Sequence, residues 1–257
     1  MRIRSVLLAA FLFTTAITIG LLLPMGMTWF QSATTPKTVE YPVEHVNLEY
    51  AQQVQLVEKY RLMATVENTV MLDAGHTSSV TQIQNAGVRF LETAFPMAES
   101  ADEAAVEPAL IVSDGQAVNV WYYHNVYTVA SDEMMFSVEL VIDDATGAVL
   151  CMKMDASMTG LLPVLCRLCG LPDDYWQNAV DSSELMQTMA ENFRLALENE
   201  QEGLQVTVVN DYLYAPAMPS DPYEPIFFSQ RLILEQGEES CNMELWAEEF
   251  MLRFNCY

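Results

Sequence analysis

The stretch that decides the fold is Val138–Asp155, VELVIDDATGAVLCMKMD, in which apolar and polar residues alternate on both sides of a polar break. Successive side chains of a β-strand point to opposite faces, so this alternation predicts two strands that each bury one face. The break contains Asp143, Asp144, Thr146 and Gly147. Aspartate accepts backbone N–H bonds, and glycine tolerates the positive φ that such turns need. We therefore predict a β-hairpin whose turn is structural and needs no ligand.

A second alternating run, VWYYHNVY, lies at residues 120–127 and is rich in the aromatic and β-branched residues that strands favour. Trp121, Tyr123 and Tyr127 share one face of this strand. Large aromatic residues are common both in cores and at protein interfaces. We favour the core for these three, because one face of the strand must pack on helices, and keep a contact surface as the alternative.

Helical patterns precede both groups of strands. Residues 47–72 contain neither Pro nor Gly and carry an apolar stripe interrupted by Lys59. The tetrapeptides SVTQ at 79–82 and DSSE at 181–184 have the spacing of capping boxes, and each precedes an apolar helical face. The chain thus reads helix then strands, twice, and a duplication is a hypothesis from this order alone. The strand-like runs of the second half are 204–213, 226–234 and 241–254.

The N-terminus is apolar enough to cross a membrane. Residues 6–30 contain no charged residue, and this length of helix would extend about 37 Å, more than the hydrocarbon core of a bilayer. Arg2 and Arg4 precede the segment and predict a cytoplasmic N-terminus. We predict an uncleaved signal-anchor with an extracytoplasmic remainder. A cleaved signal peptide, with a weak site near Ala33, is the alternative.

The rest of the chain is strongly acidic. Residues 31–257 hold all 35 Asp and Glu but only nine of the eleven Lys and Arg, and the whole chain has a formal charge of −24. Such a field repels polyphosphate, which argues against nucleic acid as a partner. The simplest role of this charge is to keep an exposed domain in solution.

Cys166 and Cys169 form a C-x-x-C unit, a spacing typical of redox sites, half zinc sites and small disulfides. There is no second C-x-x-C, and the three histidines show no ligand spacing, so the sequence predicts neither a metal site nor a cofactor. Pro163 and Pro172 flank the pair, unlike the strand-to-helix setting of a thioredoxin-like motif. We favour a structural disulfide or an incidental pair over a redox site.

Catalytic patterns are scarce. The segment DAGHTSS at 73–79 brings an aspartate, a histidine and two serines together in sequence, but no nucleophile elbow surrounds the serines and Ser79 is already the predicted helix cap. The chain contains no H-E-x-x-H, Walker or dinucleotide-binding motif. We therefore predict that the protein is not an enzyme. Solvated surface is the expected role of the adjacent acid pairs, at 143–144, 173–174, 238–239 and 248–249.

The predicted hairpin turn resembles that of PepSY-type domains, in which an alternating strand ends in a D-A-x-T-G-x-V/L turn and continues as the next strand. The matching residues in this chain are Asp144, Ala145, Thr146, Gly147, Val149 and Leu150. The resemblance covers about residues 79–155, and the second half has no such turn. It implies a non-catalytic regulatory or binding module of the kind found in bacterial extracytoplasmic proteins and peptidase propeptides.

These observations predict an α+β fold: an N-terminal transmembrane helix followed by two helix-plus-antiparallel-sheet units of PepSY or cystatin type. The predicted parts are a signal-anchor (1–30), a stalk (31–46), a PepSY-like domain (47–158), a connector with the C-x-x-C (159–180) and a second unit (181–257).

The predicted function is binding or regulation without catalysis. The expected partner is another cell-envelope protein, by resemblance a peptidase, cell-wall or sporulation factor, engaged by strand addition or by the sheet face. The predicted location is the cell membrane, through the N-terminal helix. An envelope thiol–disulfide protein or hydrolase is the alternative.

Overall fold

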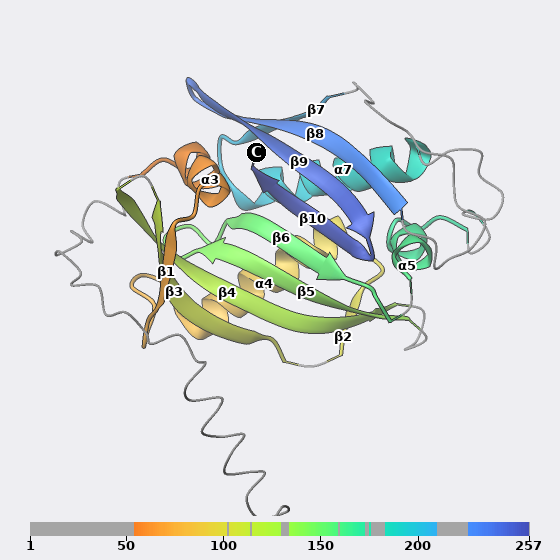
Figure 1. Cartoon of the computed structure of the whole chain (residues 1–257), viewed down its shortest axis with the longest axis horizontal. Coiled ribbons are helices and arrows are strands. Elements are labelled where there is room, and N and C mark those ends of the chain that lie inside the picture. The colour runs from red at the N-terminus through yellow and green to blue at the C-terminus, as the bar shows by residue number, and fades with distance from the viewer. Residues whose placement is uncertain are drawn as a thin grey trace, which may run out of the picture. The chain divides into compact units, whose positions relative to one another are not determined.

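One antiparallel sheet runs through the described part of the chain (Figure 1). The computed structural model describes residues 54–101, 103–113, 115–129, 134–158, 160–172, 175, 183–209 and 226–256. Within these residues the sheet has ten strands, in the order β1-β3-β4-β5-β6-β10-β9-β8-β7 with β2 paired to β4. All the pairings are antiparallel.

The sheet consists of two meanders that meet at β6 and β10. The first meander comprises β3 (Ala105–Ser113), β4 (Gln116–Val129), β5 (Met134–Asp143) and β6 (Val149–Asp155). The second comprises β7 (Gln205–Val208), β8 (Ile226–Gln236), β9 (Glu239–Glu249) and β10 (Met251–Cys256). The short strands β1 (Asn68–Met71) and β2 (Glu99–Ser100) join the first meander.

The prediction of two separate helix-plus-sheet units is wrong, because β6 and β10 lie side by side and join the meanders into one sheet (Figure 1). In their register Met152 is opposite Phe254 and Met154 is opposite Leu252. Both β6 and β10 end their meanders, so each would otherwise leave a row of unpaired N–H and C=O groups at an edge. Pairing them satisfies both rows.

The strand-like run predicted at 241–254 is two strands, β9 and β10, joined by a tight hairpin in which Glu248 is opposite Met251. The alternating pattern continues through this turn, since buried Leu245 and Ala247 precede it and buried Leu252 follows. The turn contains no Gly, Pro or Asn, the residues that usually mark a turn in a sequence. The sequence pattern therefore gives no indication that one strand ends and another begins at this point.

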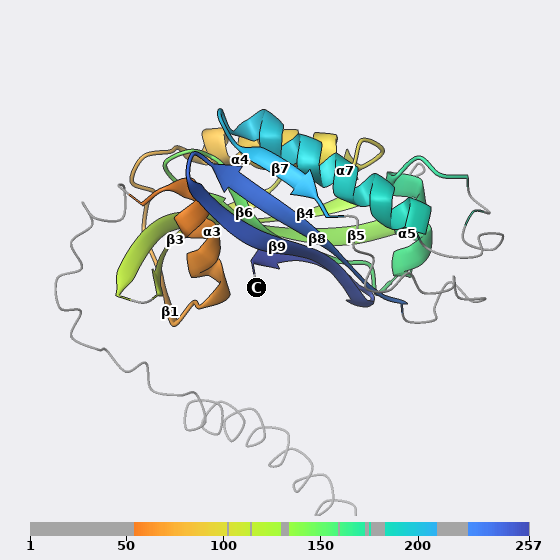
Figure 2. The same ribbon diagram turned by 90° about the horizontal axis from the view of Figure 1, so that it is seen from above.

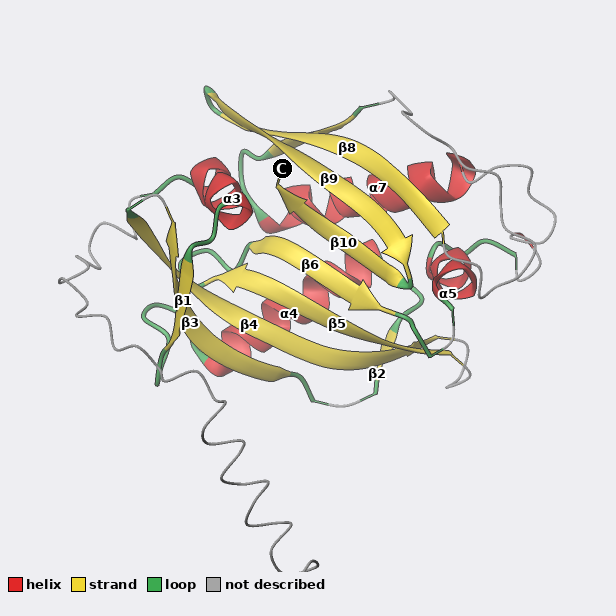
Figure 3. Ribbon diagram, in the orientation of Figure 1, coloured by secondary structure: helices red, strands yellow, loops and turns green. Residues whose placement is uncertain are grey.

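Two helices cover one face of the sheet. Helices α4 (Val80–Ala94) and α7 (Ser183–Glu200) pack side by side behind the strands (Figures 2 and 3). The predicted capping box of α4 is present: Ser79 Oγ accepts from the Gln82 N–H and Gln82 Oε1 accepts from the Ser79 N–H at 2.8 Å. Helix α7 begins at Ser183, the first described residue after the predicted cap.

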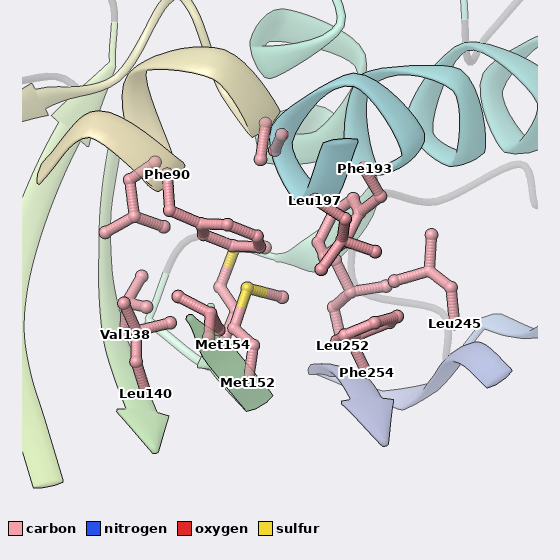
Figure 4. Close-up of a cluster of buried hydrophobic side chains, with 14 of the residues drawn as sticks. Phe90, Val138, Leu140, Met152, Met154, Phe193, Leu197, Leu245, Leu252 and Phe254 are labelled. Atoms are coloured by element: carbon pink, nitrogen blue, oxygen red, sulfur yellow. The ribbon is translucent and has the colours of Figure 1, made fainter. Parts of the chain in front are cut away.

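The two meanders share one core beneath these helices (Figure 4). The ring of Phe193 on α7 lies 5.8 Å from Phe90 on α4, 5.6 Å from Phe95 and 5.4 Å from Phe254 on β10, centroid to centroid. Apolar side chains of β5, β6, β9 and β10 complete the layer, with Val138, Leu140, Met152, Met154, Leu245 and Leu252 all buried. Such edge-to-face and tilted aromatic pairs add to the burial of apolar surface across the junction.

Two shorter helices complete the described structure. Helix α3 (Leu56–Ala64) packs against β6, β8, β9 and β10, and α5 (Leu161–Leu168) touches β4. The helix predicted at 47–72 is therefore shorter in the described residues, because Asn68–Met71 pair with β3 as strand β1. Residues 47–53 lie outside the described residues.

The predicted transmembrane helix, and with it the single-pass membrane placement, is contradicted in the part of the chain that the structure describes. No helix there is both long and apolar enough to cross a bilayer. Residues 6–30, which carried the prediction, and the predicted stalk 31–46 lie outside the described residues.

Candidate functional site on the open face of the sheet

The hairpin turn between β5 and β6 is held by Asp143. Its carboxylate accepts from Lys59 Nζ at 2.7 Å and from the Thr146 N–H and Oγ1 at 3.0 and 2.7 Å. Lys59 and Asp143 are both buried, with 3% and 1% of their side chains exposed. Gly147 takes the positive φ, 75°, that the turn requires. The turn residues therefore fasten α3 to the sheet and act structurally.

The neighbouring carboxylate, Asp144, organises the loop before α4. It accepts four N–H groups: those of His76 and Thr77 on Oδ2, at 3.1 and 2.6 Å, and those of Ser78 and the Trp121 indole on Oδ1, at 3.1 and 2.6 Å. The Ser78 hydroxyl donates to the Asp144 carbonyl at 2.6 Å. A buried carboxylate that accepts several N–H bonds is well satisfied. Asp144 thus serves as an anchor within the fold.

His76 and Ser79 of the DAGHTSS segment also have structural contacts, whereas Asp73 is exposed. The His76 ring lies 3.4 Å from Thr77 Oγ1, and the Ser79 hydroxyl donates to Gln82 Oε1 at 2.9 Å. A serine nucleophile would instead need its hydroxyl against a general base. The chain order brings these side chains close together, and the fold uses them to shape the loop and to cap α4.

The aromatic residues considered for a contact surface are in the core. Trp121, Tyr123 and Tyr127 are 3%, 1% and 4% exposed. The two tyrosine hydroxyls lie 2.6 Å apart and bond to each other. A Cβ added to Gly87 of α4 would come within 2.6 Å of the Tyr123 ring, so the helix backbone rests directly on that ring. This burial agrees with the favoured core interpretation and leaves none of the three open to a partner.

The C-x-x-C pair lies in and after α5, and no disulfide joins any of the five cysteines, all of which are described. Cys166 is buried and Cys169 half-buried. Burial, and then the nearby Cys166 thiol, raise the pKa of Cys169 above its ordinary value. Because the thiolate is the reactive form, this setting disfavours redox chemistry at neutral pH.

Metal ligands do not gather in the described residues: no group of three or more His, Cys, Asp or Glu side chains there is placed to hold an ion. Two of the predicted acid pairs, at 173–174 and 248–249, have undescribed side chains. The pair at 143–144, which we expected to be solvated, is buried and bonded as described above.

The face of the sheet opposite α4 and α7 is much less covered. Along β10 the side chains alternate between half-buried and buried, and β9 shows the same alternation up to Ala247. Directly opposed residues of an antiparallel pair point to the same face. A continuous row therefore crosses six strands from β4 to β8 on the open face. This cross-sheet row consists of His124, Glu139, Lys153, Arg253, Trp246 and Ser229.

The centre of the cross-sheet row places two cations side by side. Lys153 of β6 and Arg253 of β10 are directly opposite in the register. Like charges in opposed positions destabilise a strand pair. The Lys153 ammonium is offset by Glu139, whose carboxylate lies 3.6 Å away, in a pair with both side chains substantially exposed.

Arg253 has a different setting. Its guanidinium lies over the Trp246 ring, 4.9 Å from the centroid, and its Nη2 approaches Met251 Sδ at 3.7 Å. Its Nε is buried and has no hydrogen-bond partner. Among the side chains that the structure describes, no carboxylate pairs with Arg253. Burying an N–H without a partner is unfavourable, so the position of Arg253 costs the fold some stability.

Apolar and aromatic side chains share the open face with the pair. Tyr122 and Val141 are opposed on one side of the row, and Val126 and Met251 lie on the other, all half-buried. Trp246 also donates from its indole to Asn255 Oδ1 at 3.2 Å, which fixes the ring under Arg253. The face thus offers two cations set in a partly apolar surface.

Sequence reasoning did not identify the cross-sheet row. The alternation in VLCMKMD and MLRFNC already assigns Lys153 and Arg253 to the less buried face of their strands. Their proximity depends on the pairing of β6 with β10, which joins residues about a hundred positions apart and has no local signal.

The comparisons with known proteins found nothing similar. No protein-family model matches the chain, and neither a curated protein nor a solved structure matches it. The resemblance of residues 79–155 to PepSY-type domains therefore stays a prediction.

Proposed function

We propose that this chain is a non-catalytic binding protein that holds another protein on the open face of its sheet. The observation that carries the proposal is the pair Lys153 and Arg253 at the centre of the cross-sheet row, with Arg253 stacked on Trp246 and its Nε left without a partner. Arginine and tryptophan are among the residues most often found to dominate the energy of protein interfaces.

Binding explains the described groups better than catalysis does. Asp143 and Asp144, the acids of the motif, are engaged in bonds inside the fold. The serines of the 73–79 segment hold a loop and cap a helix. The thiol of Cys169 has a raised pKa. A hydrolase or thiol–disulfide enzyme needs one of these groups reactive and exposed to substrate.

The sheet face is a better docking surface than the sheet edges. The outermost strands β1 and β7 have only four residues each, and a short edge offers few backbone bonds to an added strand. The cross-sheet row instead spans both meanders and presents charged and aromatic side chains together, with apolar side chains on the same face.

Site-specific photocrosslinking in the producing cells tests the proposal. A photoreactive phenylalanine analogue replaces His124 or Ser229, at the two ends of the cross-sheet row, in the full chain. The matched control places it at Leu195, which is exposed on α7 on the other side of the sheet. We expect both row positions to capture one and the same protein and Leu195 not to capture it. Capture from Leu195 alone, or from no row position, would refute the proposed function.

A further inference from the structure

We infer that the partner's contact segment is acidic and seats a carboxylate between Lys153 and Arg253, an inference that rests on the proposed function. The site assigned here is therefore a carboxylate-binding site at the β6–β10 junction. Its occupant is a protein segment with one or a few Asp or Glu among apolar residues.

Local charge supports a carboxylate. Two cations opposed across neighbouring strands repel each other, and one negative group between them removes that repulsion. Glu139 lies against Lys153 alone, at 3.6 Å, and the described side chains supply no carboxylate to Arg253. The described side chains therefore leave this position open to an anion supplied by a partner.

The geometry of Arg253 suits the two oxygens of a carboxylate. Stacking on Trp246 fixes the plane of the guanidinium, and a fixed guanidinium can donate two parallel N–H bonds to a carboxylate. The Nε of Arg253 is itself buried, so the donors left for a partner's carboxylate are the terminal Nη groups. Because the side chain is already ordered, little conformational entropy is lost when the bond forms.

The surroundings favour an acidic peptide over a phosphate polymer. The formal charge of −24 repels a chain of phosphates. Glu139, Asp155 and Glu244 lie on the same open face as the pair, with Arg231 opposite Glu244, so the positive region around Lys153 and Arg253 is small. At physiological salt, charges beyond about 8 Å are largely screened, so a few carboxylates can bind locally despite the acidic molecule. Met251 beside the pair, and Tyr122 and Val126 on β4 two strands from Lys153, offer apolar surface to a protein segment.

Zero-length carbodiimide coupling tests for the carboxylate directly. The reagent activates a carboxyl group, and the Lys153 ammonium, once deprotonated, attacks it to form an amide as a urea leaves. The full chain carries Glu139→Gln, so that its own nearby carboxylate does not compete. We expect mass spectrometry to find Lys153 joined to an Asp or Glu of the protein that the Ser229 photocrosslinker captures. Lys153→Arg, which keeps the charge but removes the amine, should retain photocapture and lose this amide.

Charge reversal gives the second readout. Arg253→Glu should reduce capture from position 229 about tenfold, as expected for a lost charge-assisted pair, and Arg253→Gln should have an intermediate effect. The control Arg194→Glu changes an arginine of α7, paired with Glu191 and Glu198 away from the row, and should leave capture within about twofold.

The outcomes separate the inference from the proposed function. Capture that is unchanged by Arg253→Glu, or a captured segment that contains no acid, would overturn the carboxylate site while leaving the docking face intact. An amide from Lys153 to a second, isotope-labelled copy of this chain, or crosslinking of the row to nucleic acid, would also overturn it. Failure of all row positions to capture a protein would overturn both. The coupling uses unaltered Arg253, so the inference is tested even where an Arg253 variant fails to fold.

Discussion

Replacing Asp144 with asparagine should unfold the loop before α4. In the native protein the two carboxylate oxygens of Asp144 share four N–H donors, two at each oxygen. The side-chain amide of the introduced asparagine has one oxygen and one NH₂ group. The NH₂ would replace an oxygen that now accepts two N–H groups, so those two hydrogen bonds would be lost. Hydrogen bonds to a charged group contribute about 1.5–3 kcal/mol each, so the loss of two gives about 3–6 kcal/mol. For a chain of this size that lowers Tm by roughly 6–24 °C.

Urea unfolding of the full chain, followed by circular dichroism at pH 7, measures this loss. The control is Asp155→Asn, because Asp155 is half-buried and, among the described groups, its carboxylate accepts one hydrogen bond, from the Ser157 N–H at 2.9 Å. Its replacement should cost less than about 1 kcal/mol. Trp121 donates to Asp144 at 2.6 Å, so its fluorescence should also change in the Asp144→Asn protein. If the two variants lose similar stability with the same m-value, the assignment of Asp144 as the anchor of the loop is wrong.

Three further outcomes follow from the packing. Lys59→Met leaves a buried carboxylate without its cation and should cost about 3–5 kcal/mol in urea unfolding. Arg61→Met removes surface ion pairs with Glu58 and Glu239 and should cost about 1 kcal/mol. Gly87→Ala, normally stabilising in a helix, should destabilise by about 1–3 kcal/mol because its Cβ would lie 2.6 Å from the Tyr123 ring. Since its pKa is raised, Cys169 should react with iodoacetamide at pH 8 far more slowly in the native than in the urea-unfolded protein, and equal rates would contradict its burial.

The parts of the fold that local patterns encode were predictable, and those that depend on distant pairing were not. The β5–β6 hairpin and the capping box of α4 follow from alternation and turn chemistry within a few residues. Lys59 interrupts an apolar helical stripe. Its burial is explained only by its pairing with Asp143, which is 84 residues away in the sequence. The single sheet was not predicted for the same reason, because neither the sequence of β6 nor that of β10 indicates which strand it pairs with.

The joined sheet creates the candidate site, since each meander contributes one of its two cations. Lys153 and Arg253 repel each other across the strand pair that unites the two halves of the core, so the charges that favour an anionic partner weaken the junction that places them. A partner that supplies a carboxylate to both cations binds the paired state of β6 and β10 and not the separated strands. Linkage makes two free energies equal. The amount by which the bound partner stabilises the pairing of β6 with β10 equals the amount that this pairing adds to the affinity for the partner. In the proposed complex, fold stability and binding are therefore coupled at β6 and β10.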